Sequence, residues 1–147
     1  MKGNTGKIIQ VDLTSGIVDL MKPPEEDYRM FVGGSGLAAK IFWDRANFHA
    51  DPLSPEALLM FLNGPFAGLK LSGASRFSTA GRSPLTGNWG DSSCGGWFAP
   101  ELRYAGYDGI LLIGRSPNPV MLVIEDASIR LEPADMYLGN GLESVTR

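Results

Sequence analysis

Glycine is concentrated in the middle of this chain. Of its 19 glycines among 147 residues, 11 fall between Gly64 and Gly114, and the overall share is about twice the usual value of roughly 7%. These glycines are mixed with apolar residues rather than with the serine and glutamine of a flexible linker. The pattern therefore predicts a packed domain whose backbone makes several tight turns and close approaches.

The remaining composition is that of a folded and mildly acidic domain. The chain is 44% hydrophobic and 20% charged, with a net charge of −3, which argues against disorder. The acidic balance argues against a general nucleic-acid binder, which usually carries a basic excess. The apolar runs are far shorter than the roughly 20 residues that a membrane-spanning helix needs. We expect a cytoplasmic protein with neither a membrane nor a nucleic acid as its partner.

Strand patterns dominate the chain, and a few short helices interrupt them. Apolar and alternating runs predict strands at residues 7–13, 17–20, 58–62, 76–80, 110–113, 120–125 and 129–132. Helices are predicted to begin near the acids at 25–27, to run over 37–43, and to extend from Gly95-Gly96 to Gly106. The last two strands form a hairpin across residues 126–128. There is no regular βαβ alternation, so the predicted fold class is α+β, mainly β-strand.

The single cysteine and the single histidine limit the metal chemistry of the chain. Because Cys94 has no second cysteine, a Cys-only iron–sulfur or zinc site within these residues is excluded. Cys94 precedes a predicted helix start, so it is either a reactive thiol or, the interpretation we favour, a buried inert residue. We expect His49 to lie on the solvated surface, and Trp43, Trp89 and Trp97 to lie mostly in the core, with a pocket-lining position as the alternative for Trp89.

One stretch of the chain carries no negative charge. No acidic residue lies between Glu56 and Asp91, whereas Lys70, Arg76 and Arg82 do. Basic side chains among glycine turns that run into a helix start are what an anionic ligand such as a phosphate requires. The alternative is that these residues are ordinary surface cations on the loops of a β-rich domain, and the pattern alone leaves both open.

Several segments, taken together, resemble the N-terminal domain of the tungsten-containing aldehyde ferredoxin oxidoreductases. The opening strand pair over residues 4–16, the glycine-rich segment 32–38, and the segments 51–56 and 63–68 all match the family pattern. The densest matches are residues 76–87 and 95–108. The resemblance runs in order over nearly the whole chain.

This resemblance implies a base domain, built mainly of strands, in an enzyme that oxidises aldehydes to carboxylic acids. In the family, tungsten (or molybdenum) is held by the dithiolenes of two pyranopterins, and a magnesium ion bridges the pterin phosphates. Electrons leave through a [4Fe–4S] cluster to ferredoxin. Residues 1–147 would be the N-terminal cofactor-supporting domain, incomplete at its C-terminal end, where 141–147 is predicted to start a helix. The cluster cysteines and a second pterin contact would lie beyond Arg147, in the remaining domains.

The resemblance also assigns individual residues. Arg76 falls at the family arginine that lies between pterin and cluster, and Gly95 and Gly96 match backbone that approaches a pterin phosphate. Ser93 falls where relatives often have an asparagine whose backbone carbonyl helps bind the magnesium ion. No residue of this chain is assigned a catalytic role.

Three functions remain open at this point. The chain belongs to an aldehyde oxidoreductase, or to a relative in the same family that acts on another substrate such as an aromatic thioester, or it is a non-catalytic binding or scaffold protein. The partners implied by the first are ferredoxin, an aldehyde and the remaining domains. Assembly as a homo-oligomer is compatible with all three.

Overall fold

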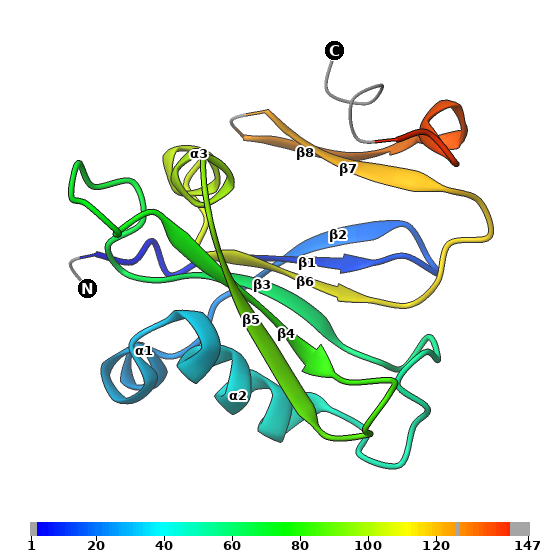
Figure 1. The fold of residues 1–147 in the computed structure, drawn as a ribbon, viewed down its shortest axis with the longest axis horizontal. Coiled ribbons are helices and arrows are strands. Elements are labelled where there is room, and N and C mark those ends of the chain that lie inside the picture. The colour runs from blue at the N-terminus through cyan, green and yellow to red at the C-terminus, as the bar shows by residue number, and fades with distance from the viewer. Residues whose placement is uncertain (1–2, 126, 142–147) are drawn as a thin grey trace.

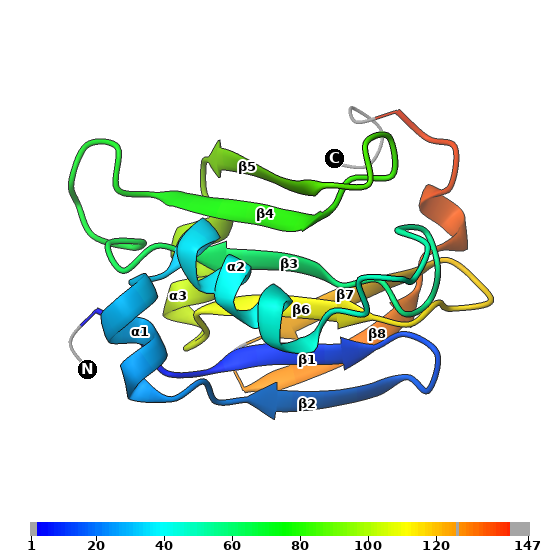
Figure 2. The same cartoon turned by 90° about the horizontal axis from the view of Figure 1, so that it is seen from below.

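A six-stranded mixed sheet forms the centre of the molecule (Figures 1 and 2). The computed structural model describes residues 3–125 and 127–141. The strands of the sheet are β1 (Ile8–Asp12), β2 (Ile17–Met21), β3 (Leu59–Asn63), β4 (Arg76–Arg82), β5 (Trp89–Gly95) and β6 (Gly109–Ile113). They lie in the order β2-β1-β6-β3-β4-β5. The β1–β6 pair is parallel and the other neighbouring pairs are antiparallel.

Both faces of this sheet are covered. Helices α1 (Glu25–Phe31) and α2 (Gly34–Arg45) lie on one face, and α3 (Phe98–Tyr104) lies on the other, as Figure 1 shows. A hairpin of β7 (Val120–Glu125) and β8 (Ser128–Pro133) also covers the α3 face, and a short 3-10 helix, η1 (Asp135–Tyr137), follows it. The result is a layered α+β fold with the sheet in the middle, which confirms the predicted fold class.

The side chains of β1 point alternately to the two faces of the sheet, and each face carries its own hydrophobic core. Ile8 belongs to the buried cluster under α1 and α2, whereas Ile9 and Val11 belong to the cluster under α3 and the β7–β8 hairpin. Successive strand residues point to opposite faces, so a strand that is apolar at consecutive positions stabilises both layers at once. All three side chains are completely buried.

The predicted strands are confirmed to within about two residues at their ends, and the three helical regions to within about three residues. Two features differ. Strand β5 was not predicted, and Gly95 ends that strand instead of opening a helix, because α3 begins only at Phe98. Asp126 in the predicted hairpin turn and residues 142–147 of the predicted C-terminal helix lie outside the described residues.

The expectation of a tryptophan core is wrong. The exposed fractions are 74% for Trp43, 79% for Trp97 and 36% for Trp89, while the aliphatic residues of the central strands fill the interior. Cys94 is also exposed, on β5, so the buried interpretation is wrong too. The prediction that His49 lies on the surface is confirmed.

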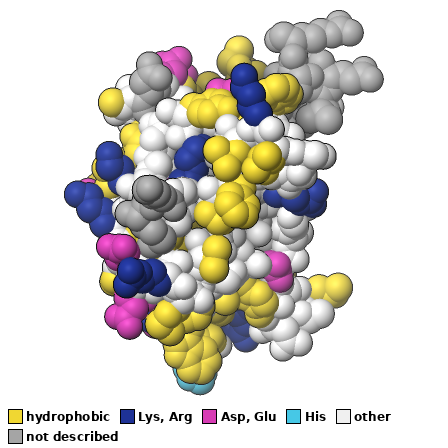
Figure 3. Space-filling view, turned by 90° about the vertical axis from the view of Figure 1, so that its left-hand side faces the viewer, with side chains coloured by type: hydrophobic (Ala, Val, Ile, Leu, Met, Phe, Trp, Pro, Cys, Tyr) yellow, Lys and Arg dark blue, Asp and Glu magenta, His cyan; other side chains and the backbone are white. Residues whose placement is uncertain are grey.

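Hydrophobic side chains reach the surface at several places. Figure 3 shows them on the side of the molecule where α1, α3 and the loop between β3 and β4 lie. The exposed apolar residues of that loop and of α3 are Phe66, Leu69, Leu71, Phe98 and Tyr104. In the part of the chain that the structure describes, no helix has the length and apolar character needed to cross a membrane.

Candidate functional site

The pairing of β4 with β5 brings three of the four predicted site residues together. Arg76 lies opposite Gly95 at the beginning of β4, and Ser78 lies opposite Ser93. Residues directly opposite each other and residues two apart share one face of a sheet. Arg76 and Ser93 are therefore diagonal neighbours on the same face, within reach of a long side chain.

The Arg76 side chain uses this arrangement to bind Ser93 at two points. Its Nε donates a hydrogen bond to the Ser93 hydroxyl, Oγ, at 2.9 Å, and its Nη2 donates to the Ser93 backbone carbonyl oxygen at 3.1 Å. Both residues are exposed. A guanidinium carries five N–H donors, so three remain available beyond these two bonds.

The two glycines leave the surface beside Arg76 open. A Cβ at Gly95 would lie 3.7 Å from Arg76 Nη1, which is an ordinary van der Waals contact, so the guanidinium lies beside this part of β5. At Gly96 nothing lies within 4 Å of the Cβ position, and its φ of 108° is a conformation that other residues rarely adopt. An anion here would meet the end of a strand and not a helix N-terminus, because α3 starts two residues later.

The other basic residues of the acid-free stretch do not join this group. Arg82 donates hydrogen bonds to three backbone carbonyls, those of Gly87 at 2.6 Å, Phe48 at 2.8 Å and Ala50 at 2.7 Å. It therefore joins the β4–β5 turn to the loop after α2. Lys70 is exposed in the loop between β3 and β4. The sequence pattern identified the charged stretch correctly, but of the two arginines only Arg76 lies beside Ser93 and Gly95.

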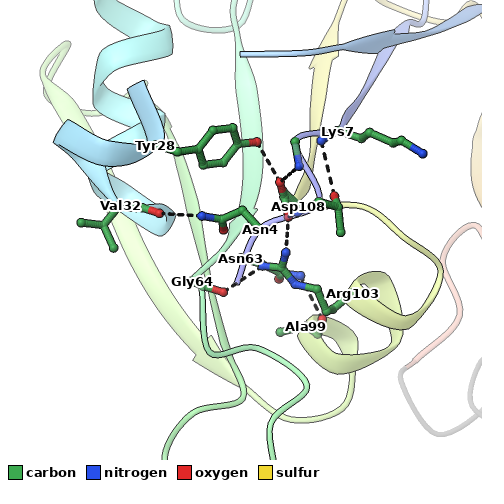
Figure 4. Close-up of polar contacts among 11 residues, drawn as sticks. Asn4, Lys7, Tyr28, Val32, Asn63, Gly64, Ala99, Arg103 and Asp108 are labelled. Atoms are coloured by element: carbon green, nitrogen blue, oxygen red, sulfur yellow. Dashed lines mark hydrogen bonds and ion pairs between the residues drawn. The ribbon is translucent and has the colours of Figure 1, made fainter. Parts of the chain in front are cut away.

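A buried polar cluster lies at the same end of the sheet as the site, and the sequence did not predict it (Figure 4). The Asp108 carboxylate is 2% exposed. It accepts hydrogen bonds from the Tyr28 hydroxyl at 2.8 Å and from the backbone N–H groups of Thr5 and Gly6 at 2.8 and 2.7 Å, and it forms an ion pair with Arg103. Burial, and then the negative charge of Asp108, raises the pKa of Tyr28, which keeps the phenol protonated as a donor.

This cluster is connected to the backbone of Arg76. Arg103 Nη2 donates to the Gly64 carbonyl at 3.0 Å, and the Gly64 N–H donates to the Arg76 carbonyl at 3.5 Å. Asn63 adds a bond from its backbone N–H to the Asp108 carbonyl at 2.8 Å. The end of β3 is thus held by a buried ion pair, and the beginning of β4 pairs with it. The sequence feature that could have revealed this cluster is Asp108, a charged residue directly before the apolar strand β6.

No conventional metal centre is formed by the described residues. Among residues 3–125 and 127–141, no three His, Cys, Asp or Glu side chains come together to hold a metal ion. A cavity of about 510 Å³ opens between α3 and β7, lined by residues that include Phe98, Leu102, Leu122 and Ile124. Its lining includes none of the four predicted site residues.

The residues on the β4–β5 face fit part of the binding site for a phosphate-bearing cofactor. Arg76 offers a planar cationic group with unused donors. Ser93 offers a backbone carbonyl oxygen, which accepts a hydrogen bond from Arg76 here and is of the kind that binds hard cations such as magnesium. Gly95 and Gly96 leave space for close approach of a ligand to the backbone. One arginine and one carbonyl are an incomplete ligand set, so other residues would have to complete it.

Comparison with known proteins gives these features a family context. The family model for the N-terminal domain of aldehyde ferredoxin oxidoreductase matches residues 8–147. The tungsten-containing aldehyde ferredoxin oxidoreductase of Pyrococcus furiosus is 34% identical over 139 residues, which are 95% of this chain and 23% of that protein. The WOR-like subunit of an aliphatic sulfonate oxidoreductase from the same organism is 33% identical over 144 residues, covering 96% of this chain and 23% of that protein.

A solved structure agrees with the sequence comparisons. It is a chain of the active site complex BamBC of benzoyl coenzyme A reductase, in complex with 1,5-dienoyl-CoA. It matches 99% of this chain with a TM-score of 0.95 and 36% identity, over 22% of its own length. The chain thus spans slightly less than a quarter of the relatives it matches. Sequence and fold agree that the chain belongs to the aldehyde ferredoxin oxidoreductase N-terminal domain family.

Proposed function

We propose that residues 1–147 are the N-terminal cofactor-supporting domain of a cytoplasmic oxidoreductase that oxidises aldehydes to carboxylic acids. The electrons would pass through a [4Fe–4S] cluster, held by other domains, to ferredoxin. This domain would contribute to the binding of a tungsten (or molybdenum) bis-pyranopterin and of the magnesium ion that bridges its phosphates. When bound, the group would supply the oxygen-transfer and electron chemistry.

The observation that carries this proposal is the convergence of Arg76, Ser93 and Gly95 on one exposed face of β4 and β5. Arg76 would bind a phosphate or a polar pterin edge through its free N–H donors. The Ser93 carbonyl would be one ligand of magnesium, and the open backbone at Gly95 and Gly96 would admit a phosphate. The buried Asp108–Arg103 pair is linked through Gly64 to the beginning of β4, at the same end of the sheet.

The test is Arg76→Ala in the intact protein, with Arg29→Ala on the exposed surface of α1 as a matched control. We expect Arg76→Ala to lower the tungsten or molybdenum content and the aldehyde-dependent reduction of ferredoxin, because the anion loses its cationic partner. Unfolding by urea should change little, since the side chain is exposed. Normal metal content together with normal aldehyde turnover in Arg76→Ala would refute its role.

A second candidate is a same-family subunit that reduces an aromatic thioester. The observation in its favour is the structural likeness to a chain of the benzoyl coenzyme A reductase complex. Assaying the intact protein with aldehydes and with an aromatic CoA thioester separates the two activities. A protein that contains neither tungsten nor molybdenum and acts on neither substrate would instead support a binding or scaffold role.

A further inference from the structure

We propose that Ser93 is a positioning residue for Arg76, acting through its side-chain hydroxyl. The hydroxyl holds the guanidinium in one orientation, so that the outer N–H groups of Arg76 are presented to an anionic ligand. This inference rests on the proposed function. It adds to the side chain of Ser93 a role separate from that of its backbone carbonyl.

The two hydrogen bonds from Arg76 to Ser93 use one edge of the guanidinium. The N–H of Nε and one N–H of Nη2 lie side by side on that edge, and they bind the hydroxyl at 2.9 Å and the carbonyl at 3.1 Å. The other edge, formed by Nη1 and Nη2, is the fork that matches two oxygens of a phosphate or carboxylate. Ser93 therefore occupies the inner edge and leaves the outer fork for a ligand.

The hydrogen bond from Arg76 to the Ser93 hydroxyl would remain if a magnesium ion bound the Ser93 carbonyl. If the Ser93 carbonyl became a magnesium ligand, the ion and the Arg76 guanidinium would contact the same oxygen. The two positive charges would then repel each other, which would weaken the hydrogen bond from Nη2 to that carbonyl. The bond from Nε to Oγ does not involve the carbonyl. The hydroxyl thus keeps Arg76 beside the site when the carbonyl is taken.

The experiment compares three variants of the intact protein: Ser93→Ala, Ser93→Thr and Ser92→Ala. Ser92 directly precedes Ser93 on β5 and points to the opposite face, so it is a matched control. The readout is the rate at which tungsten or molybdenum is lost during dilution into a chelator, followed by elemental analysis. We expect loss to be about fivefold faster in Ser93→Ala, the usual effect of one hydrogen bond. Ser93→Thr should restore the wild-type rate, and Ser92→Ala should not change it.

A double mutant tests whether Ser93 acts through Arg76. In an Arg76→Ala background, Ser93→Ala should cause no additional loss of metal, because its target is gone. Additional loss in that background would overturn the positioning role. The positioning role would also be overturned if Ser93→Ala retained metal as the wild type does while Arg76→Ala lost it. The proposed function would stand in that case. Retention of metal in Arg76→Ala itself would overturn both.

Discussion

At the scale of single residues, the most demanding group in this protein is the Asp108 carboxylate. A buried charge is costly unless it is paired and hydrogen-bonded. Asp108 meets that condition with one ion pair, to Arg103, and three further donors from Tyr28, Thr5 and Gly6. These partners come from the N-terminal segment, α1 and α3, so one side chain ties together segments that are far apart in the sequence.

The Tyr28 hydroxyl gives this cluster a predictable dependence on pH. Because its pKa is raised in the folded protein, its contribution is fully present below the unfolded value of about 10 and is lost as the pH rises above it. Tyr28→Phe should lower the free energy of unfolding at neutral pH by about 1–2 kcal/mol, since Asp108 loses a donor. It should also weaken the decline in stability that begins near the unfolded pKa of about 10 and continues up to the raised folded pKa.

Urea unfolding of wild type and Tyr28→Phe at several pH values measures both effects. Tyr104→Phe is the control, because the Tyr104 hydroxyl bonds the Gly68 carbonyl at the surface and its loss should cost little. If the free energy of unfolding fell equally steeply with pH in wild type and in Tyr28→Phe, the Tyr28 hydroxyl would not be the source of this pH dependence.

At the scale of elements, the sequence predicted those strands that carry an apolar pattern and missed the one that does not. Strand β5 reads Trp-Gly-Asp-Ser-Ser-Cys-Gly and has no β-branched residue, so its local preference is for a turn. It is a strand because β4 pairs with it along seven residues. The family resemblance could therefore identify the candidate site residues on β4 and β5. It could not predict the contact between Arg76 and Ser93, because that contact depends on the register of the β4–β5 pair.

Arg82 shows how the other end of this strand pair is held. Its three hydrogen bonds join the β4–β5 turn to the loop after α2. Arg82→Lys should lower the free energy of unfolding by about 2 kcal/mol, because a single ammonium group cannot reproduce the planar fork and leaves carbonyls unpaired. Arg29→Ala should change it by about 0.5 kcal/mol or less, as its ion pair with Glu25 is exposed. Urea unfolding measures both. Equal effects of the two substitutions would show that Arg82 is not a structural tie.

At the scale of the whole molecule, the concentration of glycine has two separate causes. At Gly81 a Cβ would lie 2.8 Å from the Leu58 carbonyl, so glycine is needed there for β3 and β4 to pack. At Gly96 the space is open, and the positive φ of 108° favours glycine over residues with a side chain. Glycine content predicted the tightly packed domain correctly, but composition could not separate the packing glycines from those beside the candidate site.

The distribution of apolar side chains leads to a prediction about self-association. Trp97 is 79% exposed, whereas Leu102, on the following helix, is 4% exposed and belongs to the core cluster with Ile9 and Val11. Trp97→Ser should therefore change the free energy of unfolding by no more than about 0.5 kcal/mol, and Leu102→Ala should lower it by about 2–5 kcal/mol.

Exposed apolar surface promotes association between molecules. Light scattering of the purified chain over a range of concentrations should accordingly show less association for Trp97→Ser than for wild type, and more for Leu102→Ala, which opens the core. Urea unfolding of the same samples supplies the stability values. A Trp97→Ser variant as unstable as Leu102→Ala would mean that Trp97 is packed in solution. Unchanged association at unchanged stability would mean that other apolar residues dominate the contact between molecules.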